Sequence, residues 1–216
     1  MKTLLLGSSS SIAIEYYNLY SNKECIDRTS SKKTEELIFL DAGDDKTYFN
    51  IGHDYDKIIC FIGYTPLIKD QYSFEELKNI VNLNFIYPIN LIEHILRFNL
   101  KKDLHFQVIT SVASVRGRKL NYQYGASKAA LSTALSGLRQ KYPKINLQEI
   151  VLGPVRTKTV PIHETPNILV SNTSIIAKSI HSGSIKKAKR YIPYFWKYIS
   201  IIITLIPEFI YKKLKF

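Results

Sequence analysis

The stretch "LLLGSSSSIA", residues 4–13, combines an apolar run, a glycine, four serines and the start of a helical pattern. An apolar run that ends at a glycine is typical of a buried strand followed by a tight turn. Serine caps helices readily, and the free amide groups at a helix N-terminus bind phosphate. The stretch therefore predicts a strand, a turn and a helix that either hold a phosphate or form an ordinary serine-capped connection.

The rest of the chain continues this alternation of apolar runs and amphipathic segments. We predict strands at Lys2–Leu6, Glu24–Asp27, Leu37–Asp41, Lys57–Ile62, Leu104–Thr110, Asn146–Val151 and Lys189–Pro193, and helices at 11–20, 73–98, 122–141 and 172–181. The connection between the second and third strands is short for a crossover helix. Continuous apolar strands such as "IICFI" favour a parallel sheet covered on both faces. The sequence predicts a single doubly wound, Rossmann-like α/β domain with a mainly parallel sheet of about seven strands.

The composition fits one globular domain in a reducing compartment. A chain of 216 residues with 45% hydrophobic content has room for a sizeable core. Its two cysteines, Cys25 and Cys60, have no Cys or His at ligand spacing, so we expect neither a disulfide framework nor a metal site. The N-terminal apolar run is too short for a signal peptide, and we expect a cytoplasmic protein.

The formal net charge of +12 is spread unevenly along the chain. Residues 1–155 contain 19 Lys/Arg and 16 Asp/Glu, whereas residues 156–216 contain 11 and 2. This asymmetry indicates an anionic partner, such as a phosphate, a membrane surface or a nucleic acid. Nucleic acid is the weakest of the three, because no zinc-finger, RNA-recognition or basic helix-turn-helix pattern is present.

A second stretch, "YGASKAALSTAL" at residues 124–135, places Tyr124 four residues before Lys128. Apolar residues at three- and four-residue steps predict a helix, so the two side chains share one face. An ammonium near a phenol lowers the pKa of the phenol, which suits a general acid. Alone the pair is a weak signal, because a chain with 15 tyrosines produces it by chance.

Several segments, in order along nearly the whole chain, resemble the short-chain dehydrogenases/reductases. The matching segments are "LLLGSSSSIA", "FLDAGDD", "CFIGY", "VNLNFIYPINL", "VITSVAS", "YGASK" and "VLGPVRT". The chain departs from the family pattern at Ser11, Ala13 and Ile62. The resemblance implies a nicotinamide cofactor and a catalytic set of four residues: Asn84, with Asn82 as the fallback, Ser111, Tyr124 and Lys128.

The resemblance also implies a role for each of these four residues. Tyr124 would donate a proton to a carbonyl oxygen as hydride arrives from the nicotinamide, and Ser111 would hold that oxygen. Lys128 would lower the pKa of Tyr124 and bind the nicotinamide ribose, while Asn84 would position a water in the proton relay. The implied cofactor-binding residues are Gly7, Ser9, Ser10, Ser11, Ile12, Arg28, Asp41, Ala42, Ile62, Gly63, Tyr124, Lys128, Val155 and Thr157.

The choice between NADP(H) and NAD(H) depends on the segment "CIDRTSSKK", residues 25–33. An acidic residue at the end of the second strand binds the ribose diol of NAD, whereas an arginine accommodates the extra phosphate of NADP. Arg28, two serines and two lysines favour NADP(H). A shift of the strand by one or two residues would instead place Asp27 on the ribose.

The C-terminal tail, residues 194–216, follows a predicted domain of residues 1–193 whose substrate loop lies near 153–170. Its apolar core, Ile199–Ile206, has aromatic residues before it and lysines after it. The core is too short to span a membrane but suits a helix at a membrane surface. The alternative is a helix packed on its own domain or on another subunit. The tail also resembles that of the reductase subunits of decaprenylphosphoryl-ribose epimerisation.

The expected activity is therefore NADP(H)-dependent reduction of a keto group in a sugar or polyol intermediate of a bacterial envelope polysaccharide. The substrate would be a small molecule or a carbohydrate carried on a polyprenyl phosphate or nucleotide. The chain would work as a homo-oligomer at the inner face of the membrane. The alternative is a catalytically silent NADP-binding regulator or scaffold.

Overall fold

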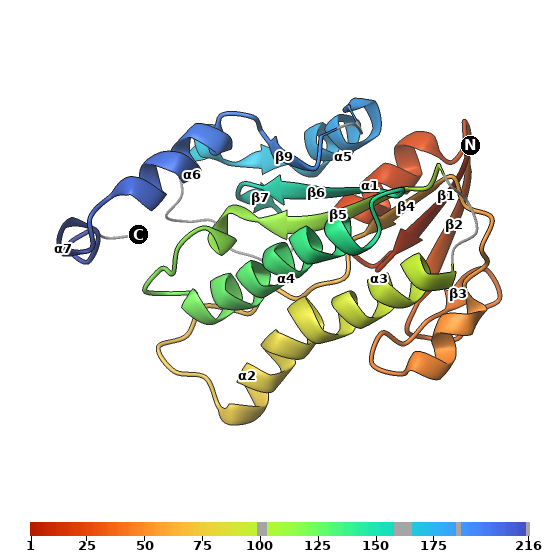
Figure 1. Ribbon diagram of the computed structural model, residues 1–216, viewed down its shortest axis with the longest axis horizontal. Coiled ribbons are helices and arrows are strands. Elements are labelled where there is room, and N and C mark those ends of the chain that lie inside the picture. The colour runs from red at the N-terminus through yellow and green to blue at the C-terminus, as the bar shows by residue number, and fades with distance from the viewer. Residues whose placement is uncertain (99–102, 158–165, 185–186, 215–216) are drawn as a thin grey trace.

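The computed structural model describes residues 1–98, 103–157, 166–184 and 187–214 (Figure 1). Its main sheet has seven parallel strands in the order β3-β2-β1-β4-β5-β6-β9. They are β1 Lys2–Leu6, β2 Cys25–Ser30, β3 Ile38–Phe39, β4 Lys57–Cys60, β5 His105–Ser111, β6 Asn146–Leu152 and β9 Lys189–Ile192. The predicted seven-stranded, doubly wound sheet is confirmed. The strand order reverses between β1 and β4, and such a switch point leaves a crevice at the carboxyl ends of the strands.

Helices cover both faces of the sheet because successive residues of each strand point to opposite sides. Leu4 and Leu6 pack against α3 Tyr87–Phe98 and α4 Tyr122–Lys141, and α2 Phe74–Val81 contacts α4. Leu5 packs against α1 Ser11–Tyr20 and α5 Thr173–Ser182. The side chains of these three leucines are fully buried. The uninterrupted apolar run is therefore what a two-sided sheet requires.

The second strand is longer than the predicted Glu24–Asp27, because β2 continues to Ser30. Thr29 is buried at 2% exposure, and its hydroxyl donates to the carbonyl of Leu5 and accepts from the amide of Gly7. The polar side chain of Thr29 is thus satisfied inside the sheet, which a reading of hydrophobicity alone misses. As expected for its length, the connection of residues 31–37 contains no helix.

The predicted helix 73–98 is divided by a π-helical turn, Asn82–Ile86, between α2 and α3. Ser73 and Glu76 form a capping box that begins α2. Pro88 has no amide hydrogen, so the ordinary helical hydrogen bond to the carbonyl of Asn84 cannot form. The wider turn carries Asn84 into the interior, where its side chain is fully buried.

The C-terminal tail forms two short helices, α6 Trp196–Leu205 and α7 Glu208–Tyr211, separated by Pro207. Trp196 is buried and packs with Val112 and Val151, so the inner side of α6 rests on the end of the sheet. Within the described residues, no helix has the length and apolar character needed to cross a membrane.

Candidate active site

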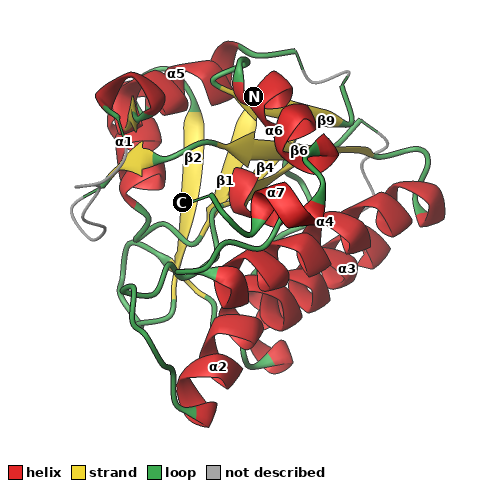
Figure 2. Ribbon diagram, turned by 90° about the vertical axis from the view of Figure 1, so that its left-hand side faces the viewer, coloured by secondary structure: helices red, strands yellow, loops and turns green. Residues whose placement is uncertain are grey.

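The four candidate catalytic residues and the Gly7 turn lie at the edge where the parallel strands end, which faces the viewer in Figure 2. Gly7 follows β1, Gly63 lies three residues after the end of β4, and Ser111 is the last residue of β5. Helix α4 brings Tyr124 and Lys128 to the same edge. The structure thus places together side chains that are far apart along the chain.

Gly7 makes the turn after β1 and has a φ of +76°, in the left-handed region that favours glycine. A Cβ at this position would lie 2.9 Å from the amide nitrogen of Ile62. The turn is fastened to the neighbouring strand by the Gly7 amide, which donates to Thr29 Oγ1 at 3.2 Å. Glycine is therefore required here both for the backbone conformation and for the close contact with the segment after β4.

The N-terminus of α1 has the character of an anion site. Its capping residue, Ser10, makes no side-chain cap hydrogen bond, and its first turn contains no acidic residue. Ser9 is exposed, and Ser10 and Ser11 are half-buried, while Ile12 is buried beneath them. Free amide groups, hydroxyls and the positive end of the helix dipole can together hold a phosphate.

Tyr124 lies beside Ser111 at the end of β5. The side chains of Ser111 and Thr65 hydrogen-bond with the Tyr124 hydroxyl, and Ser111 Oγ also accepts from the amide of Ala113 at 3.2 Å. Burial raises the pKa of Tyr124, and the two side-chain hydrogen bonds oppose this rise without cancelling it. The phenol is therefore protonated at neutral pH and can donate its proton.

Lys128 is one helical turn further along α4 and is only 5% exposed. Its Nζ lies 6.0 Å from the centroid of the Tyr124 ring, and burial lowers the pKa of Lys128 to about 8. Within the described residues, no carboxylate pairs with this ammonium. A buried cation without an anionic partner is costly and is typical of functional sites.

The expected lowering of the pKa of Tyr124 by Lys128 does not appear in this structure. The net pKa of Tyr124 is raised, because burial of the phenol outweighs the effects that favour its charged form. Burial also lowers the pKa of Lys128 to about 8, so the lysine keeps most of its charge at neutral pH and loses it above pH 8. An electrostatic benefit to Tyr124 therefore depends on what keeps Lys128 protonated.

Asn84 joins this group through the segment after β4. Its Oδ1 accepts from the amide of Tyr64 at 2.9 Å, and its Nδ2 donates to the carbonyls of Tyr64 at 2.7 Å and Ile80 at 3.0 Å. A Cβ on Gly63 would lie 2.8 Å from Lys128 Nζ and 3.0 Å from Asn84 Oδ1. Gly63 thus lets both polar groups approach the backbone, and Asn84, not the fallback Asn82, lies next to Lys128.

Gly125 is a second glycine that allows a close backbone contact, and its role was not predicted from the sequence. A Cβ there would lie 2.7 Å from the carbonyl oxygen of Ala113, so the glycine lets α4 approach the turn after β5. This approach brings Tyr124 beside Ser111. The available signal was a lone glycine inside a helical pattern, which usually has a packing reason. Thr65 was also missed, because nothing in its loop marks it.

The segment after β3 is held by its own polar contacts. Asp41 Oδ1 accepts from the amide of Gly43 at 2.9 Å, and the carbonyl of Ala42 accepts from the Tyr48 hydroxyl at 2.7 Å. Val155 lies in β7 Val155–Arg156, which follows β6 and pairs with β8 Ser171–Asn172. Thr157 ends that described stretch, and residues 158–165 of the predicted substrate loop lie outside the described residues.

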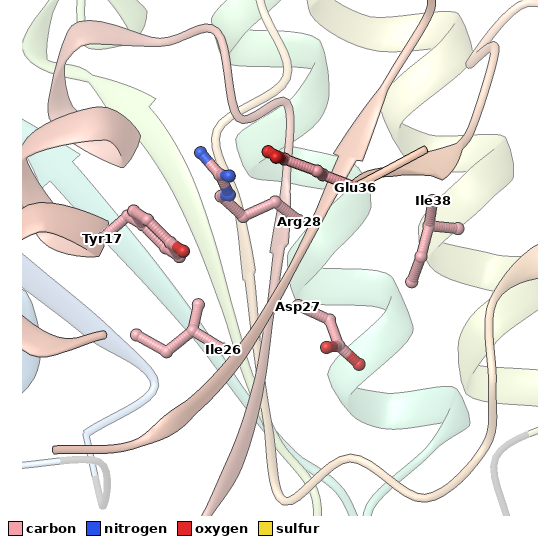
Figure 3. Close-up of a pocket in the computed structure, with 6 residues that line it drawn as sticks. All are labelled: Tyr17, Ile26, Asp27, Arg28, Glu36 and Ile38. Atoms are coloured by element: carbon pink, nitrogen blue, oxygen red, sulfur yellow. The ribbon is translucent and has the colours of Figure 1, made fainter. Parts of the chain in front are cut away.

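The structure does not place Arg28 at the end of the second strand. Arg28 lies inside β2 and its guanidinium stacks on the Tyr17 ring of α1, 3.8 Å from the centroid. The two residues line a pocket of about 350 Å³ at the outer edge of the sheet, which Glu36 also lines (Figure 3). None of the four predicted catalytic residues lines this pocket.

Asp27 is directed away from the predicted cofactor site as well. Its carboxylate accepts from the Tyr55 hydroxyl at 2.7 Å and lies 3.7 Å from Lys2 Nζ, at the start of β1. Because β2 extends to Ser30, the residues at its end are instead Ser30, Ser31, Lys32 and Lys33. Both lysines are exposed, so two cations directly follow the strand, ahead of Glu35 and Glu36 in the same connection.

The chain has the fold of known proteins, although its sequence matches none of the family models or curated proteins. The fold is similar to that of a short-chain dehydrogenase from Burkholderia cenocepacia J2315 in complex with NADP, with a TM-score of 0.79, 13% identity and 99% of each chain covered.

Two further solved structures have the same fold. A short-chain dehydrogenase from Sphingobium yanoikuyae in complex with NADPH has a TM-score of 0.76 and 16% identity, over 96% of this chain and 97% of that one. A bulky-bulky ketone specific alcohol dehydrogenase from Comamonas testosteroni has a TM-score of 0.73 and 19% identity, over 96% of each chain. The predicted fold class is confirmed by these likenesses.

The two glycines of α4 provide a matched test of the contact that positions Tyr124. Gly125→Ala should lower the free energy of unfolding by roughly 1–3 kcal/mol, because the new methyl group meets the Ala113 carbonyl. Gly137→Ala on the same helix, where a Cβ would meet nothing within 4 Å, should raise it by roughly 0.5–1 kcal/mol. Urea unfolding of both variants measures the difference, and equal effects would contradict the packing role of Gly125.

Proposed function

We propose that this chain is an NADP(H)-dependent reductase that converts a keto group to an alcohol. The observation that carries the proposal is the meeting of Ser111, Tyr124, Lys128 and Asn84 at the carboxyl edge of the sheet, beside an uncapped helix N-terminus. Each residue alone has an ordinary structural explanation. The protonated phenol of Tyr124 is hydrogen-bonded to Ser111 and lies near the buried ammonium of Lys128. Such an arrangement can deliver a proton.

The described residues fit a nicotinamide dinucleotide at both ends of the crevice. The Gly7 turn and the first amides of α1 would hold the pyrophosphate, and Lys128 would hold the nicotinamide ribose. The ammonium of Lys128 then gains the polar partner that it lacks among the described residues. When bound, the nicotinamide would supply the hydride.

The chain's own residues would supply the orientation and the proton. Ser111 would hold the substrate carbonyl oxygen, and Tyr124 would donate its proton to that oxygen as negative charge develops. The protonated Lys128 would stabilise the phenolate that remains. Asn84 would position a water in the proton relay.

We propose NADP(H) over NAD(H) because two serines and two exposed lysines come first after the buried part of β2, ahead of Glu35 and Glu36. Ser30, Ser31, Lys32 and Lys33 would contact the extra phosphate, in place of the Arg28 that the sequence analysis favoured. The solved structures from Burkholderia cenocepacia and Sphingobium yanoikuyae contain NADP and NADPH, which supports the proposal by analogy of fold.

The proposed substrate is a sugar or polyol intermediate of a bacterial envelope polysaccharide, carried on a polyprenyl phosphate or a nucleotide. The support is the resemblance of the tail to the reductase subunits of decaprenylphosphoryl-ribose epimerisation, together with the exposed apolar side chains at the site edge. They include Tyr64, Leu67 and Ile68, which follow β4. The chain would act in the cytoplasm at the inner face of the membrane, as a homo-oligomer.

The first test removes the proton donor. Tyr124→Phe should lower the rate of NADPH oxidation with keto sugars and other ketones by roughly 10²–10⁴-fold, with the NADPH dissociation constant nearly unchanged. Tyr122→Phe is the matched control, because Tyr122 is on the same helix but 57% exposed, and it should keep full activity. A Tyr124→Phe variant with full turnover would refute the assignment, and a wild-type protein that binds NADPH without turnover would favour the regulator or scaffold.

The second test uses the pKa of Lys128, which is about 8 in the protein without cofactor. NADPH binds the charged lysine better, so its dissociation constant should be lowest below pH 8 and should rise above it, by at most about tenfold per pH unit. Lys128→Met should bind weakly and without this pH dependence. Lys57→Met is the control, because Lys57 is also buried with a pKa of about 8, at the start of β4. Loss of the pH dependence in the control would contradict the assignment.

The third test concerns the choice of cofactor. Lys32→Ala combined with Lys33→Ala should weaken NADPH binding by roughly tenfold or more and leave NADH binding nearly unchanged, because only NADPH has the added phosphate. Arg28→Ala should affect both cofactors alike. Fluorescence titration with each cofactor distinguishes these cases, and an NADPH-specific loss in Arg28→Ala alone would restore the original assignment.

A further inference from the structure

The outer side of α6 is apolar and has no partner in the described chain. The helix packs inward through Trp196, Ile199, Ser200 and Ile203, which are buried or half-buried. Its outward side presents Ile202 and Leu205, which are 61% and 74% exposed. A surface helix of a soluble domain normally has polar residues on this side, so a large exposed apolar area marks an interaction surface.

Aromatic and basic side chains surround this apolar strip. Tyr194, Phe195 and Tyr198 are exposed at its start and Phe209 is exposed at its end. Lys197, Lys212 and Lys213 are exposed among them. We name these residues, together with the outward side of α6, the tail surface. Its composition of aliphatic centre, aromatic belt and lysines is the one that binds at the headgroups of a bilayer.

The one acidic residue in the described part of the tail is already paired. Glu208 forms an ion pair with Arg116 at 2.5 Å, so it does not offset the three lysines. The tail surface is therefore net positive around an apolar centre. This charge favours a negatively charged lipid surface over a second copy of the same basic chain.

Arg116 also fixes the tail surface to the site. It lies in the loop between Ser111 and Tyr124, and its guanidinium donates to the carbonyls of Ile203, at 2.9 Å, and Ile206. The same guanidinium stacks on the Tyr211 ring, 3.9 Å from the centroid. Helices α6 and α7 consequently lie at the carboxyl edge of the sheet, beside the loop that connects two of the predicted catalytic residues (Figure 2).

We infer that the tail surface docks on an anionic lipid bilayer and that this docking turns the site toward the membrane. The docking stands on the exposure, the charge and the Arg116 contacts of the tail. Only its purpose, access to a lipid-carried substrate, rests on the proposed reductase function. The loop after β4 begins at the same edge of the sheet. It exposes Leu67 and Ile68, at 58% and 57%, as a second apolar surface that such a substrate could contact.

Vesicle co-sedimentation of the full chain tests the docking without any turnover. The wild-type protein should bind vesicles of phosphatidylcholine with phosphatidylglycerol, more weakly at high salt, and should bind pure phosphatidylcholine less. Lys212→Gln with Lys213→Gln should weaken binding to the anionic vesicles by roughly 30-fold, from about 1 kcal/mol for each lysine. Ile202→Glu with Leu205→Glu should weaken it roughly tenfold or more, because the apolar centre is lost.

Ile14→Glu is the matched control, since Ile14 is 47% exposed on α1, outside the tail surface, and its variant should bind vesicles almost as the wild type does. Point variants are used because deletion of the tail would also remove the buried Trp196. Absence of vesicle binding by folded wild-type protein would overturn the inference, as would equal losses in the control. A dimer that Ile202→Glu dissociates, seen by light scattering without vesicle binding, would assign the tail surface to a second copy instead. NADPH oxidation with soluble ketones, measured without vesicles, separates failure of the docking from failure of the reductase proposal.

Discussion

The buried ammonium of Lys128 is the constraint on which the site depends. It is 5% exposed without a carboxylate partner among the described residues, and its pKa is lowered to about 8. Two glycines make this placement feasible, because Gly63 leaves room for the ammonium and Gly125 lets α4 approach the end of β5. The close contact at Gly63 also involves Asn84, and the close contact at Gly125 places Tyr124 beside Ser111. An unpaired buried charge is costly and is typical of functional sites, and the proposed cofactor would give Lys128 the polar partner that it lacks among the described residues.

The topology explains why these groups meet although the chain separates them. All seven strands of the main sheet are parallel, so every connection that follows a strand begins at one edge. That edge collects the Gly7 turn, the π-helical turn around Asn84 and the end of β5 at Ser111. It also collects the tail, which Arg116 attaches to the loop beside the site. One edge thus combines a glycine turn before an uncapped helix, a protonated phenol and an apolar, basic surface.

The fold could be predicted from the sequence because its signals are local, whereas the four candidate catalytic residues came from the resemblance to a family. The run through Leu4, Leu5 and Leu6 indicates a strand buried on both sides, and the periodicity around Tyr124 indicates a helix. The end of β2 was predicted too early, because Thr29 looks polar in sequence but is satisfied by two backbone groups in the sheet. The Arg116 contacts join residues about ninety positions apart, and no pattern of neighbouring residues reports them.

A crystal structure of the protein with NADPH bound would test the proposed cofactor site most directly. The pyrophosphate should lie at the first amides of α1 and the added phosphate at Lys32 and Lys33. The nicotinamide ribose should lie at Lys128 Nζ, with Tyr124 and Ser111 facing the nicotinamide. A cofactor bound elsewhere, such as in the pocket beside Arg28, would contradict it. So would a bound cofactor that leaves Lys128 without a polar contact.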